Sequence, residues 1–202
     1  DSMEEREFVS ASLLRQKLHE GDYAFCKKYM PETALELFTP ESLSDMGKID
    51  RAVLSVLRTK TVEELKNLPD ISEGVENKLF SAIRVAGSLE ALYNNVKVKR
   101  YTHARIRRMA LSAFIGADNS FFMKPLPYLR VLGFNKNGIE LLKEKVSKAP
   151  VPVITRTADI NNLPKDSLKV FETESRATDL FGLSLPVPLG CGLEYTSKIV
   201  TE

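Results

Sequence analysis

Histidine and cysteine are scarce in this sequence, and their scarcity excludes several kinds of site. The 202 residues include two cysteines and two histidines. Cys26 and Cys191 have neither the paired spacing of a zinc site nor the density of a disulfide scaffold, so we expect two reduced thiols. His19 and His103 alone offer little for a histidine-based metal site or a catalytic triad. We therefore predict no metal site in this chain.

Long apolar runs and common catalytic motifs are also missing. The longest apolar runs are much shorter than the ~20 residues that a membrane-spanning helix needs, and no signal peptide opens the chain. We find no Walker loop, GxSxG elbow, HExxH motif or paired CxxC. We therefore expect a cytoplasmic protein with no membrane partner, and no catalytic residue in this chain. Its first residue is Asp1 and not Met, so the chain could be cut from a longer protein.

A strong overall charge is lacking as well, because the net charge is only +2. The exception is a stretch that we call the basic segment, residues 97–108. It holds six of the 29 basic residues, namely Lys97, Lys99, Arg100, Arg105, Arg107 and Arg108. No Asp or Glu occurs from residue 91 to residue 117. The segment carries about +6, so the rest of the chain sums to about −4, and this local excess predicts a site for a polyanion.

Apolar residues recur at helical spacing through most of the chain. A composition of 43% apolar and 28% charged residues is ordinary for a globular protein. We expect helices near residues 10–21, 22–29, 32–38, 49–57, 61–65, 75–86, 88–96, 102–114, 135–146 and 167–185. A short edge strand is expected near residues 151–155. The fold class is therefore predicted to be mainly α, a compact, bundle-like helical region with at most a few short strands.

Helix placement divides the basic segment into two halves. Its first three cations follow the end of the helix predicted at 88–96, where the helix dipole favours positive charge. With Thr102 as the N-cap, the three arginines after it lie in the first two turns of the next helix, where each cation costs about 0.3–1 kcal/mol. A bound anion would reverse that cost, which indicates nucleic-acid binding. The alternative is a solvated basic face with carboxylate partners from elsewhere in the chain, for which the acidic helix at 167–185 is a candidate.

Residues 68–79 outline a tight, glycine-containing connection between two helices. Such hairpins can bind a nucleic-acid backbone, but Asp70, Glu73 and Glu76 would repel phosphate. A structural turn is the simpler interpretation, in which Asp70, Ser72 and Glu73 act as caps of the following helix.

The start of the helix at 10–21 is a second candidate site. Ser10 and Ser12 offer two hydroxyls beside unpaired backbone amides, and Arg15 follows one turn later, which is a pattern that can hold a phosphate. Serine is also a common helix cap, so a plain cap remains an alternative.

Five segments in order resemble the C-terminal half of the bacterial tRNA(Met) cytidine acetate ligase family, which is nucleotidyltransferase-like. They are Val-Ser-Ala-Ser-Leu-Leu-Arg at 9–15, Ile-Ser-Glu-Gly-Val-Glu-Asn-Lys-Leu at 71–79, the basic segment, Arg-Val-Leu-Gly-Phe at 130–134 and Arg-Ala-Thr-Asp-Leu at 176–180. The resemblance implies an enzyme that uses ATP and acetate to make acetyl-adenylate and acetylates N4 of the wobble cytidine in elongator tRNA(Met). The family's second ATP motif would fall on Ser10, Ser12 and Arg15.

The sequence departs from this family in one respect. The glycine and histidine signature of the Rossmann-like nucleotidyltransferase domain is absent, so we expect a C-terminal region that lacks this upstream domain. Residues 1–30 would be the tail end of that domain, and residues 31–202 a helical region that binds tRNA through the basic segment. ATP and acetate would be substrates of the full-length ligase, and this chain alone would be inactive. The alternatives are a non-enzymatic helical module that binds RNA or an acidic protein, and an oligomerisation domain.

Overall fold

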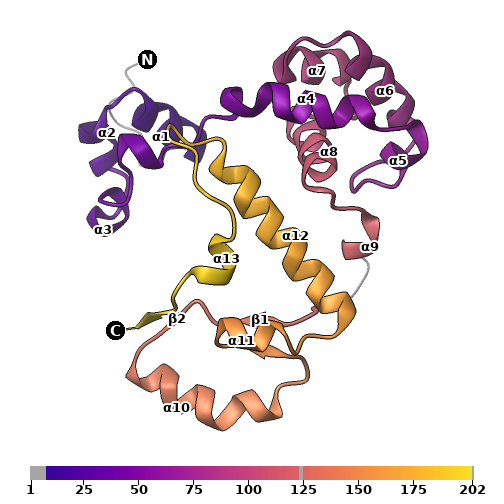
Figure 1. Ribbon diagram of the computed structural model, residues 1–202. Helices are drawn as coiled ribbons and strands as arrows, with labels where there is room; N and C mark the ends of the chain where they lie inside the picture. The colour runs from indigo at the N-terminus through magenta and orange to yellow at the C-terminus, as the bar shows by residue number, and fades with distance from the viewer. Residues whose placement is uncertain (1–7, 123–124, 202) are drawn as a thin grey trace.

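The computed structural model describes residues 8–122 and 125–201, and most of these residues lie in helices (Figure 1). The α-helices are α1 (Ala11–His19), α2 (Tyr23–Lys27), α3 (Glu32–Leu35), α4 (Asp50–Thr59), α5 (Val62–Lys66), α6 (Val75–Val85), α7 (Leu89–Val96), α8 (His103–Ile115), α9 (Asn119–Phe122), α10 (Lys136–Lys145), α11 (Thr157–Ile160), α12 (Lys165–Gly182) and α13 (Leu193–Thr196). Short 3-10 helices are η2 (Pro40–Ser42), η3 (Met46–Ile49) and η4 (Val146–Lys148).

The helices form separate groups around α12 (Figure 1). The first group is α1 to α3, the second is α4 to α8, and the third contains α10, α11 and four short strands. Helix α12 runs diagonally between the groups, and its N-terminal part lies near the third group. None of the described helices is long and apolar enough to span a membrane.

Local capping chemistry explains where several helices begin. Ser10, Thr61, Thr102 and Asn135 are N-caps whose side chains accept hydrogen bonds from backbone amides three residues later. At Thr61 the capping box is complete, because the carboxylate of Glu64 accepts from the Thr61 amide at 2.8 Å. These caps confirm the helix starts predicted from the sequence.

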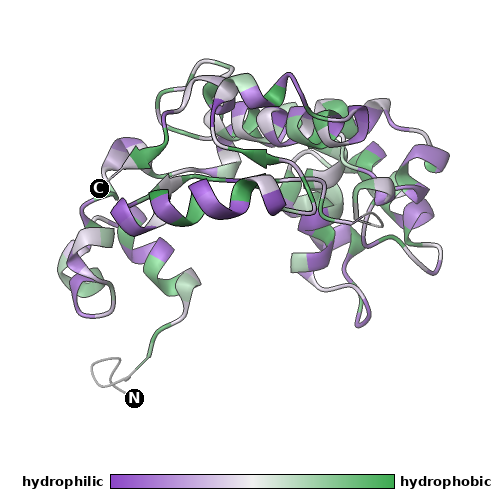
Figure 2. Cartoon of the chain, turned by 90° about the horizontal axis from the view of Figure 1, so that it is seen from below, coloured by the Kyte–Doolittle hydropathy of each residue, from purple (hydrophilic) through white to green (hydrophobic). Residues whose placement is uncertain are grey.

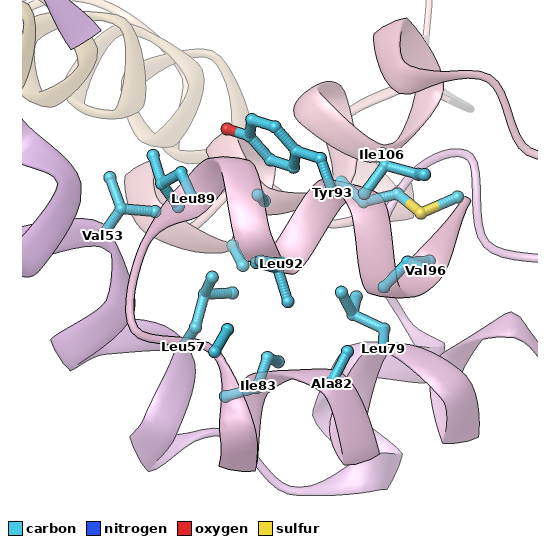
Figure 3. Close-up of a cluster of buried hydrophobic side chains, with 14 of the residues drawn as sticks. Val53, Leu57, Leu79, Ala82, Ile83, Leu89, Leu92, Tyr93, Val96 and Ile106 are labelled. Carbon is cyan, nitrogen blue, oxygen red and sulfur yellow. The ribbon is translucent and has the colours of Figure 1, made fainter. Parts of the chain in front are cut away.

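The main hydrophobic core lies within the second group. Helix α4 packs against α6, α7 and α8, and side chains from these helices point toward a shared centre (Figure 3). Leu57, Ile83, Leu92 and Ile106 are fully buried there. Burying a side chain of this size contributes about 1.5–3 kcal/mol, so this group carries much of the stability.

Two parallel strand pairs organise the third group. β1 (Leu129–Arg130) pairs with β3 (Val153–Ile154), and β2 (Gly133–Phe134) pairs with β4 (Val200–Thr201). The short strand expected at 151–155 is therefore present. The other three were not predicted, because two residues are too few to show alternation. A smaller core of Tyr128, Ile154, Ile160 and Phe171 lies beside β1 and β3.

Helix α12 contributes side chains to all three groups. Phe171 belongs to the smaller core, Leu180 packs against the main core, and Phe181 faces a cavity beside α1. The Arg176 guanidinium of α12 donates to the carbonyl of Ile115 at 3.1 Å. Helix α12 therefore contacts the C-terminal end of α8. The basic segment lies at the opposite end of α8, which makes α12 a poor source of carboxylates for it.

Candidate functional site

The start of α1 is an exposed surface with free donors. The Ser10 hydroxyl accepts from the Leu13 amide at 3.2 Å and so acts as the cap. Ser12 and Arg15 are exposed. Among the described residues, the amides of Ala11 and Ser12 have no hydrogen-bond acceptor. The cap and the phosphate interpretations are therefore compatible, because the cap uses only one of the donors at this helix end.

A largely apolar cavity of about 340 Å³ lies beside α1. Arg15 is part of its wall, together with Leu14, Met30, Phe38 and Phe181. Neither Ser10 nor Ser12 lines it. Arg15 therefore lies between the polar start of α1 and this cavity. No described carboxylate lies within ion-pair distance of its guanidinium.

The basic segment spans the connection from α7 to α8 and the first two turns of α8. Lys97, Lys99 and Arg100 are exposed in the connection. Tyr101 is 93% buried and packs in the main core, so it is not free to stack on a base.

Three arginines of the segment contact the turn before α6, which we call the acidic turn, residues 70–73. Arg108 donates from Nε to Oδ2 of Asp70 at 2.7 Å and from Nη2 to Oδ1 at 3.1 Å. Arg100 pairs with Glu73 at 2.9 Å, although both side chains are mostly exposed. Hydrogen bonding from Arg108 lowers the pKa of Asp70.

Arg105 binds the backbone of the same turn. Its Nε and Nη2 donate to the Asp70 carbonyl at 2.8 and 2.6 Å, and Nη2 also donates to the Ser72 hydroxyl at 2.8 Å. Asp70 and Glu73 have φ angles of 64° and 55°, which are costly for residues other than glycine. The arginines therefore hold a strained turn in place.

These contacts correct one prediction and decide between two alternatives. Asp70, Ser72 and Glu73 are not caps of α6, because the N-cap is Gly74 and no side chain caps that helix. For Arg105 and Arg108 the contacts favour the alternative in which partners come from elsewhere in the chain, but the partner is a turn more than 30 residues away and not the acidic helix at 167–185. The carboxylates of this turn were recognised in the sequence as groups that would repel phosphate. Their pairing with the arginines joins residues that are distant in the sequence.

The remaining cations of the segment have no such partner. Lys97, Lys99 and Arg107 form no ion pair within the part of the chain that the structure describes. Arg107 lies over the Tyr93 ring, with its guanidinium carbon 5.6 Å from the ring centroid. A polyanion site in this segment would therefore use these three side chains first.

Curated relatives of similar sequence are named tRNA(Met) cytidine acetate ligase. The protein of Thermoanaerobacter sp. (strain X514) is 31% identical over 204 residues, which cover 96% of this chain and 49% of the relative. The protein of Clostridium acetobutylicum is 31% identical and covers 99% and 50%, respectively. The chain therefore spans about half the length of the curated relatives that it matches.

Solved structures share the fold. Two crystal structures of Thermotoga maritima TmcAL, one bound with alpha-thio ATP and one apo, have TM-scores of 0.85 and 0.86. Each is 24% identical to this chain in sequence. The match covers 97% and 100% of this chain and 52% of each TmcAL chain.

The family comparison overturns the predicted place of the chain in such a ligase. A family model described as HIGH Nucleotidyl Transferase matches residues 1–188. The predictions of a C-terminal region only, of a fold that lacks the nucleotidyltransferase domain, and of a function as the tRNA-binding C-terminal part are therefore wrong. The absence of the glycine and histidine signature was taken to mean that the whole domain is absent. The family model nevertheless matches this chain along residues 1–188, most of which lie in helices. The chain belongs to the HIGH Nucleotidyl Transferase family.

Proposed function

We propose that this chain is an ATP-binding part of a tRNA(Met) cytidine acetate ligase. The observation that carries the proposal is the open start of α1, where Ser12, Arg15 and the free amides of Ala11 and Ser12 form one polar surface. The names of the relatives and the alpha-thio ATP in a structural neighbour support ATP as a substrate.

The chemistry assigns a role to each group at this surface. When acetate attacks the α-phosphorus of ATP, the bond to pyrophosphate breaks and acetyl-adenylate forms. Negative charge grows on the departing pyrophosphate, and amides at a helix start together with a guanidinium stabilise such charge. Arg15 would contact the β- and γ-phosphates, and the Ser12 hydroxyl would donate to one of them. Ser10 would act as the N-cap that stabilises the helix start, because its hydroxyl oxygen already accepts a hydrogen bond from the Leu13 amide.

The acetyl group would then pass to N4 of the wobble cytidine in elongator tRNA(Met). The basic segment is the proposed contact for the tRNA backbone, with Lys97, Lys99 and Arg107 as the available cations. Arg100, Arg105 and Arg108 would act by fixing the acidic turn beside them. This division differs from the one drawn from the sequence, which expected the three arginines of the α8 start to be the cations that need an anion.

A calorimetric titration with ATP tests the proposal. Arg15→Gln should weaken ATP binding roughly tenfold, because a charge-assisted hydrogen bond to phosphate is lost. Lys28→Gln is the matched control, since Lys28 is an exposed cation after α2 with no ion pair in the described chain. Equal affinities of the parent and of Arg15→Gln, or no ATP binding by the parent, would contradict the proposal.

The prediction that this chain alone does not activate acetate has its own assay. Neither His19 nor His103 lies in a glycine and histidine signature, so the group expected to support adenylate chemistry is not in this sequence. Acetate-dependent exchange of labelled pyrophosphate into ATP should therefore stay at background even where ATP binds. Exchange above background by the pure chain would show that the prediction is wrong.

A further inference from the structure

Two adjoining cavities lie in the third group, away from the start of α1 and from the basic segment. The first has a volume of about 350 Å³ and the second about 560 Å³. They share three wall residues, Thr155, Arg156 and Ile199. We call the first the basic cavity and the second the apolar cavity.

The basic cavity lies at the carboxyl ends of the parallel strands β1 and β3. Its wall contains Val131 and Leu132, which follow β1, and Thr155 to Thr157, which follow β3. Ligands of parallel sheets bind at these ends, because the loops that follow the strands meet there. The wall also carries three cations and a single carboxylate, that of Glu194.

Not all of these cations are available to a ligand. Arg130 is held by Glu194, which accepts from both of its terminal nitrogens, and it lies over the Phe171 ring. Arg156 is 77% exposed and has only a long contact of 3.4 Å with Asp159. Lys198 is exposed and has no ion pair in the described part of the chain. The cavity therefore offers two exposed cations, of which Lys198 is unpaired among the described residues and Arg156 is only loosely paired with Asp159.

The hydroxyls in the wall of the basic cavity provide no further hydrogen-bond donors for a ligand, because they already donate within the protein. Thr155 donates to Asp159, Thr157 to the Tyr195 carbonyl, and Ser197 to the Leu193 carbonyl. Two cations without a glycine-rich loop suit the single charge of a phosphodiester better than a triphosphate. The ligand should therefore carry one phosphate at this point.

The apolar cavity provides the complementary surface. Its wall includes Phe134, Ile139, Leu142 and Val146. Helix α10, which supplies two of these side chains, buries none of its residues, although its sequence is amphipathic. In Figure 2, which looks from below, hydrophobic turns of this helix alternate with hydrophilic ones on the near side of the molecule. An aromatic ring among aliphatic side chains is a surface on which a base can lie.

We propose that the two cavities together bind one nucleotide of a single-stranded RNA segment, with its phosphate at Arg156 and Lys198 and its base against Phe134. The proposal rests on the proposed function, because it gives the tRNA a second contact point besides the basic segment. It deepens that function by predicting that the RNA is held in part through an unpaired nucleotide.

Fluorescence anisotropy with a short, labelled single-stranded RNA tests this site. The double variant Arg156→Gln with Lys198→Gln should bind about tenfold more weakly than the parent, and the slope of log K against log salt should fall by about 0.7, since one phosphate contact on a single strand contributes about that much. Phe134→Leu keeps the aliphatic bulk and should weaken binding about fivefold through lost stacking. Lys28→Gln with Lys66→Gln is the control, because both are exposed cations outside the cavities.

The outcomes separate this site from the proposed function. RNA binding that is unchanged in the Arg156 and Lys198 variant but lost when Lys97, Lys99 and Arg107 become Gln would overturn the cavity site and leave the proposed function intact. If the same cavity variant loses affinity for AMP or for an acidic peptide but not for RNA, the RNA assignment is overturned. If the parent binds no RNA at about 50 mM salt, the cavity site and the tRNA contact both fail, whereas the ATP titration still tests α1.

Discussion

Glu194 of α13 is bonded to β1 and to α12, and its removal should be measurable as lost stability. Its carboxylate accepts from the Thr178 hydroxyl of α12 at 2.5 Å and from the Arg130 guanidinium of β1, while its backbone carbonyl accepts from Arg130 at 3.0 Å. Hydrogen bonding from Thr178, then from Arg130, lowers the pKa of Glu194 below its ordinary 4.5. The side chains of Arg130 and Glu194 are each only 21% exposed.

Hydrogen bonds to a charged group contribute about 1.5–3 kcal/mol each, and partial exposure reduces that figure. Glu194→Gln should therefore lower the free energy of unfolding at pH 7 by about 2 kcal/mol, and Tm by about 4–8 °C in a chain of this size. Because the folded-state pKa of Glu194 is depressed, its contribution is present above the unfolded pKa and is lost as the pH falls through the folded pKa.

Urea unfolding followed by circular dichroism at several pH values measures this effect. Glu172→Gln is the matched control, because Glu172 is exposed on α12 and has no ion pair among the described residues. The difference between the parent and Glu194→Gln should be full at pH 7 and should shrink at about pH 3. A difference that is equally large at both pH values would refute the role of the Glu194 charge.

Two further predictions concern the main core and the thiols. Leu92→Ala should lower the free energy of unfolding by about 3 kcal/mol in urea titrations, since Leu92 is fully buried and the change leaves a cavity; a loss below about 1 kcal/mol would contradict that packing. Cys191 should react with a thiol reagent in seconds to minutes and Cys26 only on unfolding, because Cys191 is exposed while burial raises the pKa of the Cys26 thiol; equal rates in the folded protein would contradict this.

Local signals in the sequence were sufficient to predict most of the helices. Ser10, Thr61 and Thr102 each act within three residues of themselves, so their role as N-caps could be inferred without knowledge of the fold. The end of α8 is also local, because Gly116 has a φ of 75° that favours glycine. A β-carbon there would lie 2.8 Å from Nη1 of Arg176, a contact that the sequence could not predict.

The candidate sites were less predictable because their contacts join distant residues. Asp70 and Arg108 are 38 positions apart, and the packing of α6 against α7 and of α7 against α8 brings them together. The sequence therefore identified the basic segment but not the division between its engaged and its available cations. The adjoining cavities were missed entirely, since Arg156 follows β3 and Lys198 precedes β4, and only the folded chain brings both residues to the wall of one cavity.

The length of α12 fixes the geometry of the whole chain. Its 18 residues span about 27 Å at 1.5 Å per residue, and its contacts at successive turns serve different groups of elements. A single inserted residue would rotate one end by about 100° relative to the other, so that Phe171 and Leu180 could not both face their cores. Evolution can therefore lengthen the loops of this protein far more freely than this helix, whose register sets the orientation between its two ends.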